Sequence, residues 1–152
     1  MAKTRWLSRR EERAWRTYRQ MQMLLSAQIA ADLTRDSGLS DPDYDVLSTL
    51  SEKRGERWPL RELAAKMLWS RSRLSHHLTR MEQRGLVARR DDPDDLRGCM
   101  VVLTTHGQKT LEGAAPPHVE SVRTHLIDLL TDDEVDQLAR IAAKVLHHFD
   151  TA

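Results

Sequence analysis

Apolar residues along this chain follow two spacings, one typical of helices and one typical of strands. Between Ala14 and Leu33 they recur at three- and four-residue steps, so one face of a long helix is apolar. The helical spacing returns in two stretches after residue 105. Residues 86–90 and 99–103 are instead rich in residues that favour strands. The pattern predicts a mainly α protein with a small β-hairpin.

The first two predicted helices carry clear end signals. Ser8 can cap the first helix, and Gly38, which tolerates a left-handed backbone, ends it. Asp41 followed by Pro42 then suits the cap and first turn of a second helix. That helix is expected to run out at residues 53–55.

Two C-terminal helices are expected to begin with capping boxes, in which a threonine and a residue three positions later satisfy each other's backbone amides. The boxes span residues 105–108 and 131–134. Pro116 and Pro117 fall inside the first of these helices. Because proline lacks an amide donor, they are expected to kink or interrupt it.

The middle of the chain predicts a helix-turn-helix followed by a hairpin. Residues 57–59 form a short extended connector, since proline biases the residue before it away from the helix. Helices follow over residues 60–67 and about 70–84, and the two strands then flank an acidic loop. This order is typical of a winged helix, which reads duplex DNA.

The net charge of +1 conceals an uneven distribution. Residues 53–90 hold eleven Lys or Arg and three Asp or Glu, whereas residues 110–152 hold three bases and eight acids. A basic centre between acidic flanks suits a protein that presents one face to an anionic polymer. The alternative is a solvated helix surface on which cations cluster by chance.

The second helix of the helix-turn-helix separates an apolar face from a basic one. Leu74, Leu78 and Met81 share one face and are expected to point into the core. Residues 70–81 contain no acid, whereas a solvated face usually includes glutamate. Hydroxyls suit phosphates and long donors suit guanine edges, so this helix is predicted to enter the major groove. Its predicted DNA contacts are Ser70, Arg71, Ser72, Arg73, Ser75, His76, His77, Thr79 and Arg80.

The acidic loop between the two predicted strands contains one arginine. Placed after a helix-turn-helix, the loop can reach an adjacent minor groove, where Arg97 would be the inserted cation. Asp95 stands two positions earlier and can hold Arg97 by a charge-assisted hydrogen bond. Taken alone, the loop equally suits an ordinary Asp-Pro turn. Arg90, Asp95 and Arg97 complete the predicted DNA-binding set.

Several short motifs resemble a known family. They are Glu62-Leu-Ala64, Ser72-Arg-Leu-Ser75, Arg84-Gly-Leu-Val87, Asp95-Leu-Arg-Gly98 and Val102-Leu-Thr-Thr-His-Gly107. Residues 38–47 and 115–123 extend the similarity to both flanks. In this combination the chain resembles the multiple antibiotic resistance regulator (MarR) family of winged helix-turn-helix transcription regulators.

The resemblance implies a homodimer whose first, fifth and sixth helices form the interface, with Arg97 at each wing tip. It implies an N-terminal dimerisation helix over residues 1–38, a winged helix-turn-helix DNA-binding domain over residues 39–104, and C-terminal dimerisation helices over residues 105–152. Leu68 departs from the family pattern, because similar sequences often have glycine in this turn. A left-handed leucine costs about 1–2 kcal/mol, so the turn is open to a different local geometry.

The resemblance also implies a small effector, often an aromatic or phenolic acid, bound between the dimerisation helices and the winged domain. Aromatic walls with one arginine suit an anionic aromatic compound. The alternative is that Trp15 and Tyr18 simply pack the core of the dimer. The candidate ligand residues are Trp15, Arg16, Tyr18, Met23 and Tyr44.

Thiol or metal regulation of the same fold is an alternative. Cys99 is the one cysteine, but its alternation with Val101 and Leu103 favours a small core or edge residue over a reactive thiol. The histidines that suit a regulatory metal site are His106, His118 and His125. No nucleophile elbow, phosphate-binding loop or cysteine cluster occurs in the sequence, which argues against an enzyme and predicts no cofactor or bound metal.

The sequence predicts a cytoplasmic regulator. It has no apolar run near the roughly 20 residues that cross a membrane, and no apolar segment at its N-terminus that suits export. The predicted function is a ligand-responsive homodimeric repressor that binds a pseudo-palindromic duplex operator with half-sites roughly 10 bp apart. The alternative is a helical protein-interaction module without DNA binding.

Overall fold

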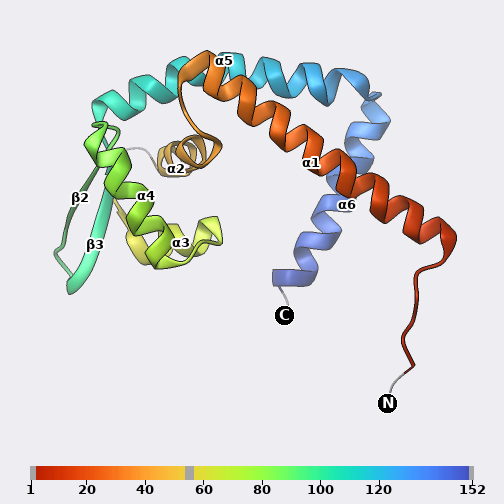
Figure 1. Cartoon of the computed structure of the whole chain (residues 1–152). Helices are drawn as coiled ribbons and strands as arrows, with labels where there is room; N and C mark the ends of the chain where they lie inside the picture. The colour runs from red at the N-terminus through yellow and green to blue at the C-terminus, as the bar shows by residue number, and fades with distance from the viewer. Residues whose placement is uncertain (1–2, 54–56, 151–152) are drawn as a thin grey trace. The chain divides into compact units, whose positions relative to one another are not determined.

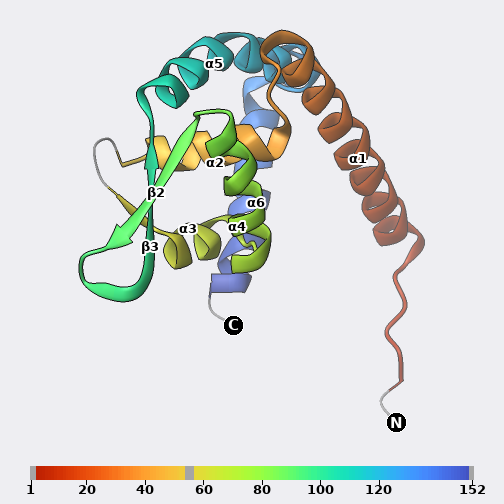
Figure 2. The ribbon, with the colours of Figure 1, turned by 60° about the vertical axis from the view of Figure 1, so that its left-hand side comes forward.

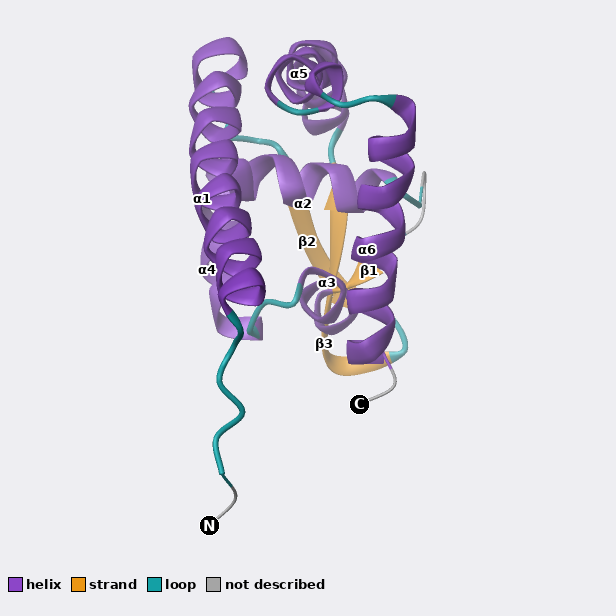
Figure 3. Cartoon of the chain, turned by 90° about the vertical axis from the view of Figure 1, so that its right-hand side faces the viewer, coloured by secondary structure: helices purple, strands orange, loops and turns teal. Residues whose placement is uncertain are grey.

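The computed structural model describes residues 3–53 and 57–150 of the chain (Figure 1). Its elements are α1 (Arg9–Ser37), α2 (Asp41–Ser51), β1 (Trp58–Pro59), α3 (Leu60–Met67), α4 (Arg71–Gln83), β2 (Val87–Asp92), β3 (Asp95–Leu103), α5 (Thr105–His125), the 3-10 helix η1 (Ile127–Leu129) and α6 (Asp132–Asp150). Helices predominate over strands (Figure 3). The predicted mainly α fold with a small β wing is confirmed.

The chain divides into two compact units. The central unit is Leu33–Pro117, and the flanking unit combines the chain up to Asp32 with the chain from His118 onwards. Both boundaries fall inside helices, so α1 and α5 each contribute to both units. The dimerisation roles assigned to residues 1–38 and 105–152 stay predictions.

The central unit contains a three-stranded antiparallel sheet in the order β1-β3-β2. β2 and β3 form a long hairpin (Figure 2), with Val87 opposite Leu103. Both strands extend further toward the loop than predicted. Residues 57–59 were expected only as a connector, but Trp58 pairs with Val101 of β3. A two-residue strand is too short for a periodic pattern to reveal.

The core of the central unit lies between the sheet and α2, α3 and α4. Leu47, Leu63 and Val101 are completely buried in it. The three residues of α4 that were predicted to point inward, Leu74, Leu78 and Met81, are also completely buried, which confirms the predicted orientation of this helix.

The cap of α2 differs from the predicted one. Ser40 rather than Asp41 is the N-cap: its Oγ accepts from the Asp43 amide at 3.1 Å, and Asp43 Oδ2 accepts from the Ser40 amide at 3.0 Å. Ser40 is favoured because Asp43, three residues later, completes a reciprocal capping box. α2 ends at Ser51, before the predicted end at residues 53–55, which lies partly outside the described residues.

α5 also begins differently from the prediction. Thr104 caps it, since its Oγ1 accepts from the Gly107 amide at 2.9 Å, so the proposed box at residues 105–108 is wrong. The helix runs through Pro116 and Pro117 to His125 without interruption. Each proline removes only its own amide donor, and the remaining helical hydrogen bonds continue past it.

The turn between α3 and α4 keeps the left-handed geometry that glycine would favour. Leu68 has φ 58° and ψ 34°, and its side chain is 92% exposed. The Leu68 amide donates to the Ala65 carbonyl and the Trp69 amide to the Ala64 carbonyl, which satisfies the end of α3. The left-handed backbone of Leu68 therefore costs about 1–2 kcal/mol of conformational energy at this turn.

In the flanking unit, a buried carboxylate joins α1 to α5. Asp32 Oδ2 accepts from Ser121 Oγ at 2.7 Å and lies 3.0 Å from His125 Nε2. Its Oδ1 accepts from Gln28 Nε2 at 2.9 Å. These bonds give the polar Asp32 enough partners to offset its burial.

Much of the apolar surface of the flanking unit is uncovered. No residue of α6, from 132 to 150, is buried, although Ile141, Val145, Leu146 and Phe149 form a helical stripe. Trp15, Met23 and Leu24 of α1 are likewise exposed. Among the described residues, no helix is both long and apolar enough to cross a membrane.

Candidate nucleic-acid interface

α4 begins with a cap that leaves its first turn open to an anion. Ser70 Oγ accepts from the Arg73 amide at 3.1 Å, and Arg71 and Ser72 follow on the exposed surface. The remaining amides of a helix N-terminus carry partial positive charge, and no acid lies in this first turn. The start of α4 is therefore suited to a phosphate.

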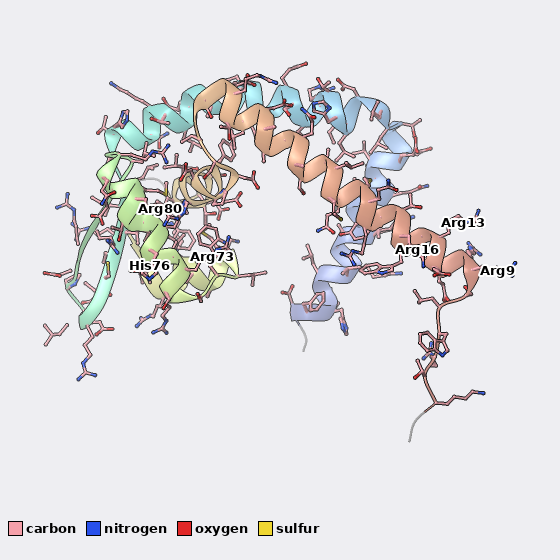
Figure 4. The ribbon with its side chains drawn as sticks, viewed as in Figure 1. Arg9, Arg13, Arg16, Arg73, His76 and Arg80 are labelled. Carbon is pink, nitrogen blue, oxygen red and sulfur yellow. The ribbon has the colours of Figure 1, made fainter. Side chains whose placement is uncertain are left out.

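Three exposed basic side chains follow the cap along α4. Arg73, His76 and Arg80 project from this helix (Figure 4), on the side away from Leu74 and Leu78. The Arg73 guanidinium lies 3.9 Å from the centroid of the Trp69 ring, a cation–π contact that limits its orientations. The face is both basic and partly preorganised.

Arg89 of β2 braces α4 and was missed from the sequence. Its Nε donates to Glu82 Oε1 at 2.6 Å, its Nη1 to Ser75 Oγ at 3.1 Å and its Nη2 to Thr79 Oγ1 at 2.8 Å. The hydroxyls of Ser75 and Thr79, predicted to contact DNA, therefore also hold the wing to α4. Strand alternation contains a signal for this role, because position 89 shares the inward face of buried Val87.

His77 is not on the exposed face, which corrects the prediction that it contacts DNA. It is buried, with Nε2 2.9 Å from Asp43 Oδ1 and Nδ1 3.0 Å from Arg80 Nη2. Both ring nitrogens are occupied within the protein. Burial lowers the pKa of His77 below its ordinary value, against the opposing effect of Asp43.

Asp43 connects α2 to both the middle and the end of α4. Besides His77, it binds Arg84, whose Nη1 donates to Asp43 Oδ2 at 2.7 Å. Burial acts to raise the pKa of Asp43, but the hydrogen bonds from Arg84 and Ser40 and the charge of Arg84 hold it below the usual value. Asp43 is therefore a charged anchor for the helix.

The contact between Asp95 and Arg97 in the wing differs from the predicted one. Asp95 Oδ1 accepts from the backbone amide of Arg97 at 3.0 Å, while Asp95 Oδ2 lies 3.5 Å from Arg61 Nη1. The Arg97 side chain is exposed and is not held by Asp95 as expected. Gly98 follows because a Cβ there would lie 2.9 Å from Asp92 Cβ. The turn is thus shaped by the side chains of Asp92 and Asp95, which accept from backbone amides and leave no room for a Cβ at position 98.

A groove separates the start of α4 from the wing. Its lining residues include Arg71 and Ser72 of α4 and Asp95, Arg97 and Cys99 of the wing. Arg90 is exposed on β2. Of the predicted contacts, Arg71, Ser72 and Ser75 of α4 therefore share this groove with Asp95 and Arg97 of the wing, whereas Arg73 and Arg80 line a separate hollow of the central unit.

The five candidate ligand residues do not share one hollow. Trp15, Arg16 and Met23 line a hollow along α1 together with Trp6, which was not among the predicted residues. Tyr18 lies beside Trp15, with ring centroids 6.1 Å apart. Tyr44 belongs instead to the central unit, where it packs against the core. Its assignment to this hollow is not supported.

The residues considered for thiol or metal regulation lack suitable surroundings. Cys99 is half-buried, and burial raises the pKa of its thiol, which disfavours the thiolate. His125 is bound to Asp32. Across residues 3–53 and 57–150, no three His, Cys, Asp or Glu side chains cluster in a way that could hold a metal ion.

Comparisons with known proteins agree with this geometry. The MarR family model matches residues 39–99. The transcriptional regulator HosA of Escherichia coli O111:H- is 34% identical over 110 residues, which are 72% of this chain and 78% of HosA. AbsC, a MarR family regulator from Streptomyces coelicolor, superposes with a TM-score of 0.91 at 41% identity, covering 98% of this chain and all of AbsC. Sco3205 from the same organism, solved in complex with DNA, has a TM-score of 0.91 at 36% identity, covering 96% of this chain and 91% of Sco3205.

The fold and this surface define a winged-helix DNA-binding transcription regulator, a class of proteins that are not enzymes. The chain belongs to the MarR family.

Proposed function

We propose that this protein is a homodimeric, ligand-responsive repressor that places α4 in the major groove of a pseudo-palindromic operator. The observation that carries the proposal is the exposed face of α4, which is basic, free of acids over residues 70–81 and braced against the wing by Arg89. Repression follows where the operator overlaps a promoter, because the bound protein occupies the duplex that the polymerase needs.

The contacts on α4 divide by chemistry. Ser70, Arg71 and Ser72 lie at the helix N-terminus, where hydroxyls and amides suit phosphates. Arg73, His76 and Arg80 lie further along the exposed face and are the candidates for base edges. Ser75 and Thr79 accept hydrogen bonds from Arg89 and also lie on the side of α4 proposed to face the major groove. Phosphate contacts set the register, and base contacts supply the sequence preference.

The wing supplies a second contact. Arg97 is exposed at the tip of the hairpin, and its side chain length suits insertion into a narrow minor groove. Arg90 of β2 is exposed and suits a phosphate, while Asp95 shapes the turn through the backbone of Arg97. Asp92 and Asp95 accept from backbone amides within the turn, so these two acids have a structural role.

Dimerisation is supported by the uncovered apolar stripe of α6 and the exposed aromatic face of α1. A soluble chain gains free energy by burying such stripes against a second copy. A two-fold axis then sets two α4 helices about one helical turn of DNA, or roughly 10 bp, apart. An anionic aromatic effector bound in the hollow of Trp6, Trp15, Arg16 and Met23 would favour a dimer with a different helix separation, to the extent that it binds that dimer more tightly.

Titration of the protein with duplex DNA at several salt concentrations tests this function. The probe is a duplex recovered by selection from a random library, compared with a scrambled duplex of the same length. Tight binding to the selected duplex that weakens steeply with salt is expected, because phosphate contacts release counterions. Equal affinity for both duplexes, or binding insensitive to salt, would contradict the proposal.

A further inference from the structure

The Asp43–His77–Arg80 chain of hydrogen bonds runs from the buried interior to the basic face of α4. Asp43 belongs to α2, His77 is buried in the middle of α4, and Arg80 is exposed one turn later. The His77 ring contacts Asp43 through Nε2 at 2.9 Å and Arg80 through Nδ1 at 3.0 Å. A residue of the core is thus connected directly to a side chain of the proposed DNA-contacting surface.

The two contacts together require one form of the imidazole. A carboxylate only accepts, so His77 Nε2 carries a proton and donates a hydrogen bond to Asp43. A guanidinium only donates, so His77 Nδ1 must offer its lone pair to Arg80. This is the neutral ring with the proton on Nε2. A second proton on Nδ1 would face the Arg80 donor and add a like charge beside it.

We propose that Asp43 and His77 are positioning residues for Arg80, which hold its guanidinium in the orientation that reads DNA sequence and release it when His77 is protonated. The proposal rests on the assignment of α4 as the reading helix. It goes beyond that assignment because neither positioning residue touches DNA.

The surroundings of His77 favour the neutral ring. Arg73 and Arg80 on α4 act to lower its pKa in addition to burial, and Asp43 on α2 acts to raise it. Arg84, bound to the same carboxylate, already partly compensates the Asp43 charge. The resulting pKa lies below the ordinary value of 6.5, so the Arg80 contact is present at neutral pH.

A double-mutant cycle with His77→Phe and Arg80→Ala tests the positioning role. The rings of Trp69 and His77 meet edge to face, with centroids 5.6 Å apart. Phenylalanine keeps an aromatic ring in this position but removes both ring nitrogens. Each single variant is expected to weaken binding to the selected duplex by about tenfold and to lose most of the preference for the selected over the scrambled duplex. Arg80→Ala should add little in the His77→Phe background, because an unpositioned arginine has already lost its specific contact.

The matched control is His125→Phe, which removes a second Asp–His contact, of 3.0 Å between His125 Nε2 and Asp32 Oδ2, in the flanking unit. The losses of DNA affinity caused by His125→Phe and Arg80→Ala should add. Light scattering checks that each variant keeps the mass of the unmodified protein. Additive effects of His77→Phe and Arg80→Ala would overturn the positioning role while leaving α4 as the reading helix. Full specificity in Arg80→Ala would overturn both the proposal and the role of Arg80 in DNA reading.

The pH profile of the unmodified protein gives a second test that needs no variant to fold. The ratio of affinities for the selected and scrambled duplexes should fall as pH drops through the His77 pKa, which NMR of the ring protons measures directly. His76 on the exposed face of α4 is present in both proteins, so the comparison is made with His77→Phe, whose folding circular dichroism first confirms. The ratio should fall less in His77→Phe than in the unmodified protein over the same range, and an equal fall would contradict the proposal. A flat ratio in the unmodified protein would contradict release of Arg80 by protonation.

Discussion

Arg89 Nε donates to Glu82 Oε1 at 2.6 Å and so ties the wing strand β2 to the C-terminal half of α4. Both side chains are mostly shielded from solvent, and the same guanidinium reaches the hydroxyls of Ser75 and Thr79. α4 and the wing, the two parts proposed to contact DNA, are therefore fixed relative to each other before DNA binds. A preformed frame reduces the ordering cost of binding.

Arg89→Ala should destabilise the fold, because Glu82 loses a close charged partner. The unfolding free energy in urea is expected to fall by about 1–2 kcal/mol. Arg90→Ala, on the same strand but exposed, should change the unfolding free energy by no more than about 0.5 kcal/mol while weakening DNA binding. Equal losses of stability in the two variants would show that the brace contributes nothing.

Arg73→Ala should weaken binding to the selected duplex by about 1–3 kcal/mol and relax its sequence preference, if the guanidinium reads a base edge. Arg71→Ala, at the first turn, should weaken selected and scrambled duplexes alike and reduce the salt slope by about one. Fluorescence anisotropy at three salt concentrations separates the two behaviours. Lys109→Ala, at an exposed position of α5, is the control and should change neither quantity.

Arg97→Ala should lower the affinity for the operator without altering stability, because the side chain is exposed and makes its contact only in the minor groove. The loss should be greatest on duplexes whose flanks are A·T-rich, where the groove is narrow. Footprinting across flanking variants measures this dependence. An unchanged footprint in Arg97→Ala would remove the wing from the interface.

Asp43→Asn should lower the unfolding free energy at pH 7 by about 2–3 kcal/mol, since the buried carboxylate serves His77 and Arg84. The pKa of Asp43 is lowered in the folded state, so its contribution is present above the unfolded value and is lost as pH falls below 3.8. The difference between wild type and variant should therefore shrink at pH 3. Asp136→Asn, at an exposed position of α6, should show little change at either pH.

Val145→Asp should disrupt the proposed dimer, because it places a charge in the apolar stripe of α6. Light scattering is expected to report a lower mass, and DNA affinity should fall with it. Arg140→Asp introduces the same residue on the opposite face of the helix and should leave the mass unchanged. A monomeric unmodified protein that still binds the selected duplex tightly would contradict the proposed assembly.

Local signals predicted much of the helical framework. The bounds of α3 agree with the predicted residues 60–67, and the box of Thr131 and Glu134 forms as expected, with hydrogen bonds of 3.0 and 3.2 Å. Gly38 ends α1 with φ +71°. Caps and periodic faces depend on residues within one helical turn, so the sequence alone shows them. Asp41 was mistaken for the cap because two adjacent residues both suit that position.

The sequence by itself therefore determined the helices, the buried face of α4 and the basic character of its other face. Only the tertiary structure decided that His77 is withdrawn to Asp43, which is 34 positions earlier, and that Arg89 braces α4. The physical reason is that polar side chains take whichever partners packing brings near. Those partners come from other elements, and no spacing along the chain specifies them.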